Sequence, residues 1–175
     1  MGKPFRLLRY DWPLHLVLFF TNWLPDNVVF LRLRGWLARP FFGKCGVDLR
    51  LARNLTFYNP SQMELGKNIY IAYGCWLNAG EKIYIGDEVI FGPYCVVSSS
   101  DHTRHHGSFR YGEPKREPIR IGKGSWIASH VIVTAGSEIG AGSIIAAGAV
   151  VKGKIPSDAL AAGLPARVVG ELSNV

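Results

Sequence analysis

The feature that most constrains the fold of this chain is a repeat with a period of six residues, which begins at residue 65. An aliphatic or aromatic residue leads each repeat, and the residue that follows it is small in most cases. A period of six fits neither an α-helix nor a simple strand, so short extended segments must alternate with turns at a fixed interval. We therefore predict stacked coils, in which the lead residues form an internal column and the small residues allow sharp corners. The lead residues are Leu65, Ile71, Leu77, Ile85, Phe91, Val97, Ile121, Ile127, Val133, Ile139, Ile145 and Val151.

The repeat is interrupted at two places. Two extra residues lie around Gly80–Lys82, which indicates a bulge at one corner of the coil. Between Val97 and Ile121 the repeat pauses for 24 residues (121 − 97). Because this number is a multiple of six, the coil is expected to resume in phase after a polar, histidine-rich loop at residues 101–118. A long loop on a regular scaffold is where function usually resides.

The cysteines point to core packing rather than to chemistry. Cys45, Cys75 and Cys95 cannot all pair within the chain, and they show no CxxC spacing. The pattern therefore supports neither a disulfide framework nor a zinc knuckle. Cys75 and Cys95 each stand four residues after a lead residue, where other repeats carry small or β-branched side chains. We expect both to be small hydrophobic core residues.

Residues 1–45 differ in kind from the repeats. The segment Leu14–Leu24 is strongly apolar and begins directly after Pro13. Eleven residues of helix span roughly 16 Å, about half of a bilayer core, so this segment is not expected to cross a membrane. Asp26 is the expected N-cap of a second short helix, Asn27–Ala38.

Two interpretations of these helices stay open, and both can hold at once. The helices pack on the open end of the main domain, or they lie in a membrane interface. Of the net charge of +7, residues 1–53 carry +6, from nine Lys or Arg against three Asp, and the other 122 residues are close to neutral. Beside an aromatic-rich apolar segment, this excess favours an anionic membrane surface over nucleic acid. In that interpretation Arg32, Arg34 and Arg39 reach phosphates, and Trp12, Trp23 and Trp36 lie at the boundary.

Size and compartment follow from the same composition. With 175 residues, 48% of them hydrophobic, the chain suits one cored domain without extensive disorder. No small-residue cleavage site follows the apolar stretch, so a cleavable signal is not expected. The expected location is the cytoplasm. If the helices lie in a membrane interface, the expected place is the inner face of the cell membrane.

The repeats and their surroundings resemble the left-handed β-helix hexapeptide acyltransferases. Within them the chain is similar to the maltose and galactoside acetyltransferase branch and to the related enzymes that acetylate capsular or exopolysaccharide sugars. The resemblance covers roughly residues 60–170 and rests on three segments besides the repeats. These segments are Asp101-His102-Thr103-Arg104-His105-His106, Ile121-Gly122-Lys123-Gly124-Ser125-Trp126-Ile127 and Ala162-Gly163-Leu164-Pro165-Ala166-Arg167-Val168-Val169.

The resemblance implies a fold and an assembly. The fold is all-β, a left-handed parallel β-helix over residues 46–170 with a catalytic loop at 101–118. An amphipathic helical region at 1–45 precedes it, and a tail at 171–175 follows it. The assembly is a homotrimer with active sites between subunits.

The implied activity is transfer of acetyl from acetyl-CoA, as co-substrate and without a metal, to a hydroxyl of a sugar or glycan intermediate. A sugar hydroxyl is barely acidic, so its attack on a thioester needs a base, and a neutral imidazole suits this near pH 7. The family's catalytic histidine maps to His102, and its oxyanion donor maps to the backbone N–H of Ser129. The family's Thr-Lys-Asp motif is replaced by Lys152-Gly153-Lys154 in this chain. Several positions match the family's contacts to coenzyme A, and the cations among them would meet the phosphates of that ligand. These positions are Trp126, Ala128, Ser129, Ala147, Lys152, Lys154 and Arg167.

The acceptor positions match the family less well. An aspartate of the galactoside and maltose enzymes falls at Gly80 here, which disfavours simple maltose or galactoside as substrate. Lys115-Arg116 and the basic N-terminus better suit an anionic or lipid-linked glycan, as in surface polysaccharide biosynthesis. The polar candidates for acceptor contact are Asn78, Glu81, Asp101 and His105, and the stacking candidates are Tyr73 and Trp76.

Three alternatives to a glycan acetyltransferase stay open. The same chemistry would serve an antibiotic or other xenobiotic hydroxyl. The γ-class carbonic anhydrases share these repeats, but their zinc site needs a histidine pair five residues apart on one coil, and His130 has no such partner. A β-helix used only as a scaffold would bind no coenzyme A.

Overall fold

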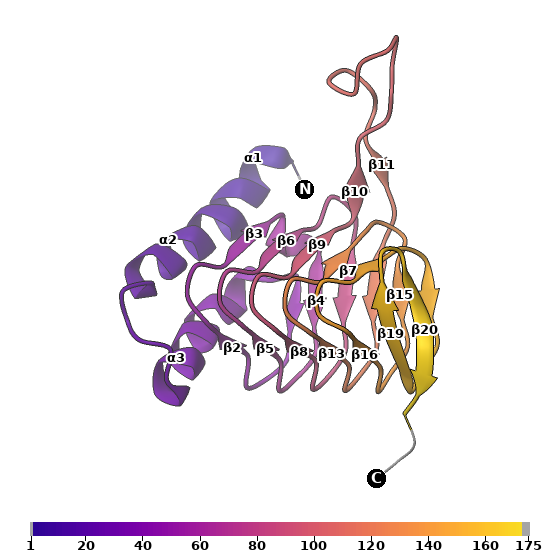
Figure 1. The fold of residues 1–175 in the computed structure, drawn as a ribbon. Helices are drawn as coiled ribbons and strands as arrows, with labels where there is room; N and C mark the ends of the chain where they lie inside the picture. The colour runs from indigo at the N-terminus through magenta and orange to yellow at the C-terminus, as the bar shows by residue number, and fades with distance from the viewer. Residues whose placement is uncertain (1, 173–175) are drawn as a thin grey trace.

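The computed structural model describes residues 2–172, and most of these form a parallel β-helix with three faces (Figure 1). Each turn of the coil contributes one short strand to each face, and strands of successive turns pair in parallel. We name the faces sheets A, B and C. Sheet A contains β1 (Lys44–Cys45), β4 (Met63–Leu65), β7 (Ile83–Ile85), β12 (Ile119–Ile121), β15 (Glu138–Ile139) and β18 (Lys154–Ile155). Sheet B contains β2 (Arg50–Leu51), β5 (Tyr70–Ile71), β8 (Ile90–Phe91), β13 (Trp126–Ile127), β16 (Ile144–Ile145), β19 (Ala159–Gly163) and β20 (Ala166–Glu171), and sheet C contains β3 (Thr56–Tyr58), β6 (Trp76–Asn78), β9 (Val96–Ser98), β14 (Ile132–Val133) and β17 (Val150–Val151).

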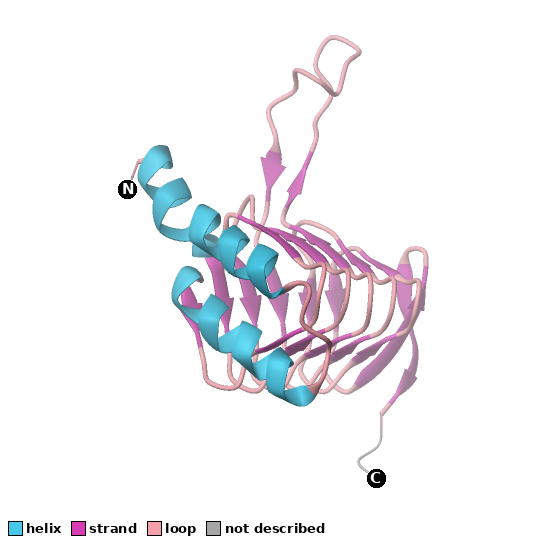
Figure 2. Cartoon of the chain, turned by 90° about the vertical axis from the view of Figure 1, so that its left-hand side faces the viewer, coloured by secondary structure: helices cyan, strands magenta, loops and turns pink. Residues whose placement is uncertain are grey.

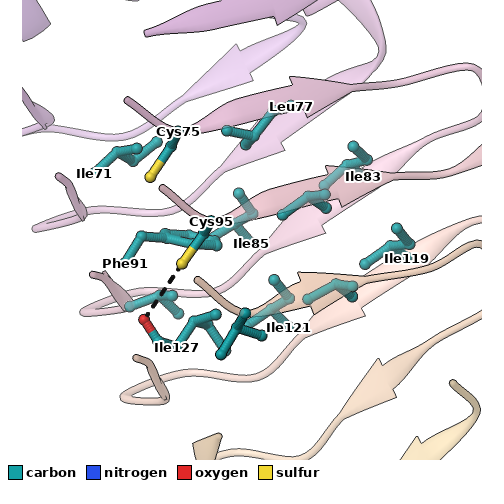
Figure 3. Packing of buried hydrophobic residues seen from close by; sticks show 14 of the residues in the cluster. Ile71, Cys75, Leu77, Ile83, Ile85, Phe91, Cys95, Ile119, Ile121 and Ile127 are labelled. Carbon is teal, nitrogen blue, oxygen red and sulfur yellow. Dashed lines mark hydrogen bonds between the residues drawn. The ribbon is translucent and has the colours of Figure 1, made fainter. Parts of the chain in front are cut away.

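The lead residues of the repeat fill the interior of the coil, as the sequence predicts (Figure 3). On sheet B, Ile71, Phe91, Ile127 and Ile145 lie opposite one another on successive strands, and each is fully buried. Full burial of such a side chain contributes about 1.5–3 kcal/mol. The repeated apolar column therefore holds the turns in register.

The cysteines occupy the positions predicted for them. Cys75 and Cys95 are fully buried, and the Cys95 Sγ lies 3.8 Å from the Ile127 carbonyl oxygen (Figure 3). All three cysteines are free. Burial raises the pKa of the Cys45 thiol to about 11, so this thiol stays protonated near neutral pH.

Both interruptions of the repeat lie at the corner where the chain passes from sheet C to sheet A. The bulge around Gly80–Lys82 connects β6 to β7 at this corner. The long loop leaves the same corner one turn later through an antiparallel pair, β10 (Ser100–Asp101) and β11 (Lys115–Arg116). Figures 1 and 2 show it projecting away from the coil. The coil resumes in phase, since β12 pairs directly with β7.

The β-helix extends beyond the detected repeat at both ends. Its first strand begins at Lys44, so the boundary predicted between residues 45 and 46 falls inside the first turn. At the other end, β19 and β20 pair antiparallel and close sheet B. The predicted tail at 171–175 begins within β20, and residues 173–175 lie outside the described part of the chain.

The N-terminal helices cover the open end of the coil (Figure 2). The first segment runs without a break through α1 (Lys3–Arg6), the π-helical η1 (Leu7–Asp11) and α2 (Trp12–Thr21). The apolar segment Leu14–Leu24 therefore coincides only in part with a longer helical segment, which begins at Lys3 and ends at Thr21. Pro13 lies in the first turn of α2, and the π-helical turn before it keeps the segment continuous across a residue that lacks an N–H. The remaining helices are α3 (Val28–Ala38) and the short 3₁₀ turns η2 (Arg39–Phe41) and η3 (Pro60–Gln62).

The N-cap of α3 also differs from the prediction. Asn27, not Asp26, is the cap, because its side-chain oxygen accepts a hydrogen bond from the Phe30 N–H at 3.1 Å. Asp26 instead pairs with Arg34 at 3.2 Å and with Arg53 at 3.3 Å. Its carboxylate therefore joins α3 to the first turn of the coil.

Arg34 cannot bind a membrane phosphate, contrary to the prediction, because only 1% of it is exposed. Its guanidinium donates to the carbonyl oxygens of Thr21, Leu24 and Leu51. Arg34 thus joins both helical segments to strand β2. Within residues 2–172, none of the helices is both long and apolar enough to span a bilayer.

Candidate active site

His102 lies at the base of the projecting loop, directly after β10, and its side chain is exposed. Asp101 pairs opposite Lys115 in the two-stranded base of the loop. The Thr103 hydroxyl donates to the Glu113 carbonyl oxygen and ties the two arms of the loop together. His102 is therefore held close to the body of the coil. His105 lies further along the loop, where its backbone pairs with Ser108.

Two predicted acceptor residues lie at the same corner as the base of the loop. The Asn78 side chain donates to the Ser100 hydroxyl at 3.3 Å. The Glu81 N–H donates to the Ser99 hydroxyl at 2.9 Å, and both Asn78 and Glu81 are half-buried. Residues that are far apart in sequence therefore lie together at the C–A corner, the set of turns that lead from sheet C to sheet A.

Tyr73 and Trp76 do not share a site, although the sequence grouped them. Trp76 lies on the outer face of sheet C, and its ring is 5.5 Å from that of Tyr58. Tyr73 lies in the preceding turn, where its ring is 5.5 Å from Tyr94 and its hydroxyl accepts from Asn54. Tyr58 is a further candidate for stacking that the sequence did not predict. The contact between Tyr58 and Trp76 depends on the pairing of β3 with β6, in which Tyr58 lies opposite Asn78, and no sequence motif indicates it.

The predicted oxyanion donor lies at the B–C corner, the set of turns that lead from sheet B to sheet C. Ser129 follows β13, and Ala147 occupies the matching turn after β16. The Ser129 carbonyl accepts from the Gly148 N–H at 2.9 Å, whereas the N–H groups of Ser129 and Ala147 have no backbone acceptor among residues 2–172. Trp126 is half exposed on the adjoining strand, and Ala128 is buried beneath the turn. Two free donors and small side chains thus line this corner.

The three predicted phosphate contacts are not clustered within one chain. Lys152 is exposed at the C–A corner after β17. Lys154 lies on the outer face of sheet A, where its ammonium group is 2.8 Å from the Glu138 carboxylate. Arg167 is exposed on β20 and donates to the Ala166 carbonyl at 2.9 Å. The three cations therefore lie on different parts of the coil surface of one chain.

One chain does not bring the candidate base and the candidate oxyanion donor together. His102 leaves the C–A corner, and Ser129 lies at the B–C corner, on the opposite edge of sheet C. Ser129 and Thr134 flank that sheet and are five residues apart, which at about 3.3 Å per residue corresponds to roughly 16 Å. Such a gap is too wide for both groups to act on one thioester.

A groove of about 720 Å³ lies over the first turn of the coil, between the first helical segment and β3. Its lining is mostly apolar, with Asp11 and Tyr58 among its polar groups. Burial raises the pKa of the Asp11 carboxyl, whose oxygen accepts from the Asn59 N–H at 3.1 Å. Across the described residues, no group of three or more His, Cys, Asp or Glu side chains is arranged to hold a metal ion.

Comparison with known proteins reveals clear relatives. A family described as bacterial transferase hexapeptide (six repeats) matches residues 118–153. Galactoside O-acetyltransferase of Escherichia coli (strain K12) is 33% identical over 138 residues, which cover 79% of this chain and 68% of that protein. A solved galactoside acetyltransferase in complex with coenzyme A matches with a TM-score of 0.83 and 30% identity, over 99% of this chain and 84% of the other. A maltose O-acetyltransferase from Clostridium difficile 630 matches with a TM-score of 0.80 and 26% identity, over 97% and 89%.

Proposed function

The chain belongs to the hexapeptide-repeat O-acetyltransferases of the galactoside and maltose acetyltransferase type, and we propose that it acetylates a sugar or glycan hydroxyl with His102 as general base. Membership makes it an acetyl-CoA-dependent enzyme, which sets aside the scaffold and carbonic anhydrase alternatives. The observation that carries the proposal is the position of His102. Its imidazole is exposed at the base of the loop, at the same corner as Asn78 and Glu81.

In the proposed reaction, the neutral His102 imidazole takes the proton of the acceptor hydroxyl as the hydroxyl oxygen attacks the thioester carbonyl. A tetrahedral intermediate forms, with negative charge on the former carbonyl oxygen. When this intermediate collapses, the carbon–sulfur bond breaks and the imidazolium returns its proton to the departing thiolate. The products are an O-acetyl ester and free coenzyme A, and the imidazole is again neutral.

The Ser129 N–H is the proposed donor to the oxyanion. Backbone N–H groups that are fixed in advance stabilise such charge without rearrangement, and loss of one donor typically costs a factor of about 10²–10³ in rate. The N–H of Ser129 and that of Ala147 are both unpaired within the described chain, which supports a role in binding the thioester arm. The small Ala128 beside them leaves room for an extended ligand.

The separation of His102 from Ser129 supports an active site shared between two copies of the chain, in a homotrimer. The outer faces of the three sheets differ in a way that supports this assembly. Sheet A carries ion pairs such as Lys44–Glu64 and Lys154–Glu138, and is suited to solvent. Sheets B and C expose Ile90, Trp126 and Ile132, which is apolar surface suited to a neighbouring copy. Three copies that use these two faces form a closed ring.

For the acceptor, we propose a glycan whose sugar ring stacks on Trp76 and Tyr58, with Asn78 and Glu81 as hydrogen-bonding partners. The tilted pair of rings on sheet C offers the apolar platform that sugar rings commonly use. Lys115 and Arg116 at the base of the loop favour an anionic glycan, such as an intermediate of surface polysaccharide synthesis.

The proposal is tested by incubating the purified protein with acetyl-CoA and a panel of acceptors. The panel contains neutral sugars, anionic sugars, lipid-linked saccharides and a hydroxyl-bearing antibiotic. We expect release of free coenzyme A thiol with a saccharide acceptor, and a mass increase of one acetyl group on the product. Turnover with the antibiotic alone would contradict the proposed acceptor class.

The Trp76→Ala variant should raise the KM for the saccharide acceptor by roughly tenfold, because a lost ring contact is worth about 1.5 kcal/mol. The KM for acetyl-CoA should stay unchanged, since Trp76 is not among the proposed coenzyme contacts. Tyr84→Ala is the matched control, because Tyr84 is a half-buried aromatic on sheet A that contacts Arg120 instead. Equal effects of the two substitutions on acceptor KM would argue against the stacking platform.

A further inference from the structure

The outward side of the first helical segment is a continuous apolar stripe. Phe5, Leu8, Trp12, Leu16 and Phe19 recur every three or four residues, and all are exposed. Trp12 and Phe19 lie at the edge of this stripe, where they also line the groove beside β3. The stripe continues through Phe20 and Trp23, which are 64% and 77% exposed. The opposite side of the same segment packs inward, since Leu14 is 1% exposed.

Helix α3 extends this apolar surface. It lies beside α2 on the end of the molecule, as Figure 2 shows. Val29, Leu33 and Trp36 repeat at the same helical spacing and are also exposed. We call the combined surface the outer helical face. A soluble protein rarely leaves so many large apolar side chains together in water, so the face is expected to meet a partner.

The charges around the outer helical face are positive. Arg6, Arg9 and Arg39 lie on these helices and have no carboxylate within 4.0 Å in the described chain. Arg9 and Arg39 make their hydrogen bonds to backbone carbonyls instead.

The acidic side chains of this end are turned inward and occupied. Asp11 binds the Asn59 N–H, and Asp26 pairs with Arg34 and Arg53. Asp48 pairs with both Arg32 and Arg50. The predicted role of Arg32 at a phosphate is therefore weakened by an existing carboxylate partner, whereas Arg39 has none in the described chain.

The geometry points to an anionic lipid surface as the occupant of the outer helical face, and we propose that the two helical segments lie flat in the membrane interface. Apolar and aromatic side chains would enter the boundary between headgroups and acyl chains, and the free arginines would meet lipid phosphates. A second copy of the chain fits less well, because pairing this face with itself would bring Arg6, Arg9 and Arg39 near the same charges. Docking is independent of acetyl transfer and would hold the enzyme where lipid-linked acceptors reside.

Docking is tested by sedimenting the full chain with vesicles of phosphatidylcholine, with and without phosphatidylglycerol. We expect binding to the anionic vesicles, weak binding to the neutral ones, and loss of binding as salt is raised. Changing Arg6 and Arg9 to Gln together should lower affinity for anionic vesicles by roughly tenfold to thirtyfold. Equal binding to the two vesicle types, or none to either, would overturn the proposal.

The apolar contribution is tested with the triple variant Leu8→Ser, Phe20→Ser and Trp23→Ser, which leaves the lining of the groove untouched. It should lose vesicle binding and keep full turnover with a water-soluble acceptor. The control is Leu164→Ser with Val169→Ser, since these side chains are equally exposed at the opposite end of the coil and should bind vesicles normally. If the triple variant instead bound vesicles normally but formed smaller oligomers, the face would be an interface between copies, and the proposal would fall.

Discussion

Replacing His102 with alanine should lower kcat by a factor of roughly 10²–10⁴, the usual contribution of a positioned general base. The binding of coenzyme A should be unchanged, because none of the proposed coenzyme contacts lies in the loop. Stopped-time assays of thiol release give kcat, and calorimetric titration with coenzyme A gives the Kd. A loss of turnover with an unchanged Kd is the signature of a group that acts on the acceptor proton.

A control variant must separate the effect of the imidazole from the effect of a changed loop conformation. Arg104→Ala removes an exposed charged side chain two residues away in the same loop, and it should leave kcat within about twofold of the unchanged protein. Comparable losses in the two variants would mean that the loop conformation matters and the imidazole does not.

Replacing Arg34 with methionine should lower the free energy of unfolding by about 3–5 kcal/mol, because three backbone carbonyl groups lose their donor at a cost of about 1–3 kcal/mol each. The loss is large because methionine supplies no donors. The Thr21, Leu24 and Leu51 carbonyls and the Asp26 carboxylate would each lose a hydrogen bond. Both helical segments and β2 meet at this side chain, so we expect them to loosen together.

Arg32→Met is the matched control, because it lies two residues away on the same helix but is exposed. Its partner Asp48 keeps Arg50, so the expected loss is below about 1 kcal/mol. Urea unfolding followed by circular dichroism, at one fixed protein concentration, measures both variants. A difference of less than about 1 kcal/mol between them would contradict the role assigned to Arg34.

The six-residue period was enough to predict the coil, because each lead position must point inward for the turns to stack. It also predicted the resumption at Ile121, since a loop that replaces whole repeats leaves the register intact. It did not predict the first turn, whose strands begin at Lys44, because helices cover that end and its residues follow no strict repeat. The cap of α3 and the burial of Arg34 depend on carbonyl groups from three separate segments, and no local pattern records them.

The candidate site was only partly predictable for a related reason. In a three-sided coil, neighbouring residues around a turn can belong to different faces. Tyr73 and Trp76 are three residues apart, yet one lies at the B–C corner and the other on sheet C. Tyr58, 18 residues before Trp76 (76 − 58), contacts its ring through strand pairing. Loop residues such as His102 were easier to identify, because they stand outside the repeat.

A mixed oligomer tests most directly whether the base and the oxyanion donor of one active site come from different copies of the chain. One chain carries His102→Ala, and the other carries Ala147→Trp, which fills the exposed turn proposed to hold the thioester arm. Each variant alone should be inactive. Co-expressed with two different affinity tags and purified through both, the mixed trimers should show about one third of the unaltered activity, because one seam in three unites an intact His102 with an intact coenzyme corner. If the doubly purified oligomers have no more activity than either variant alone, the shared site is contradicted.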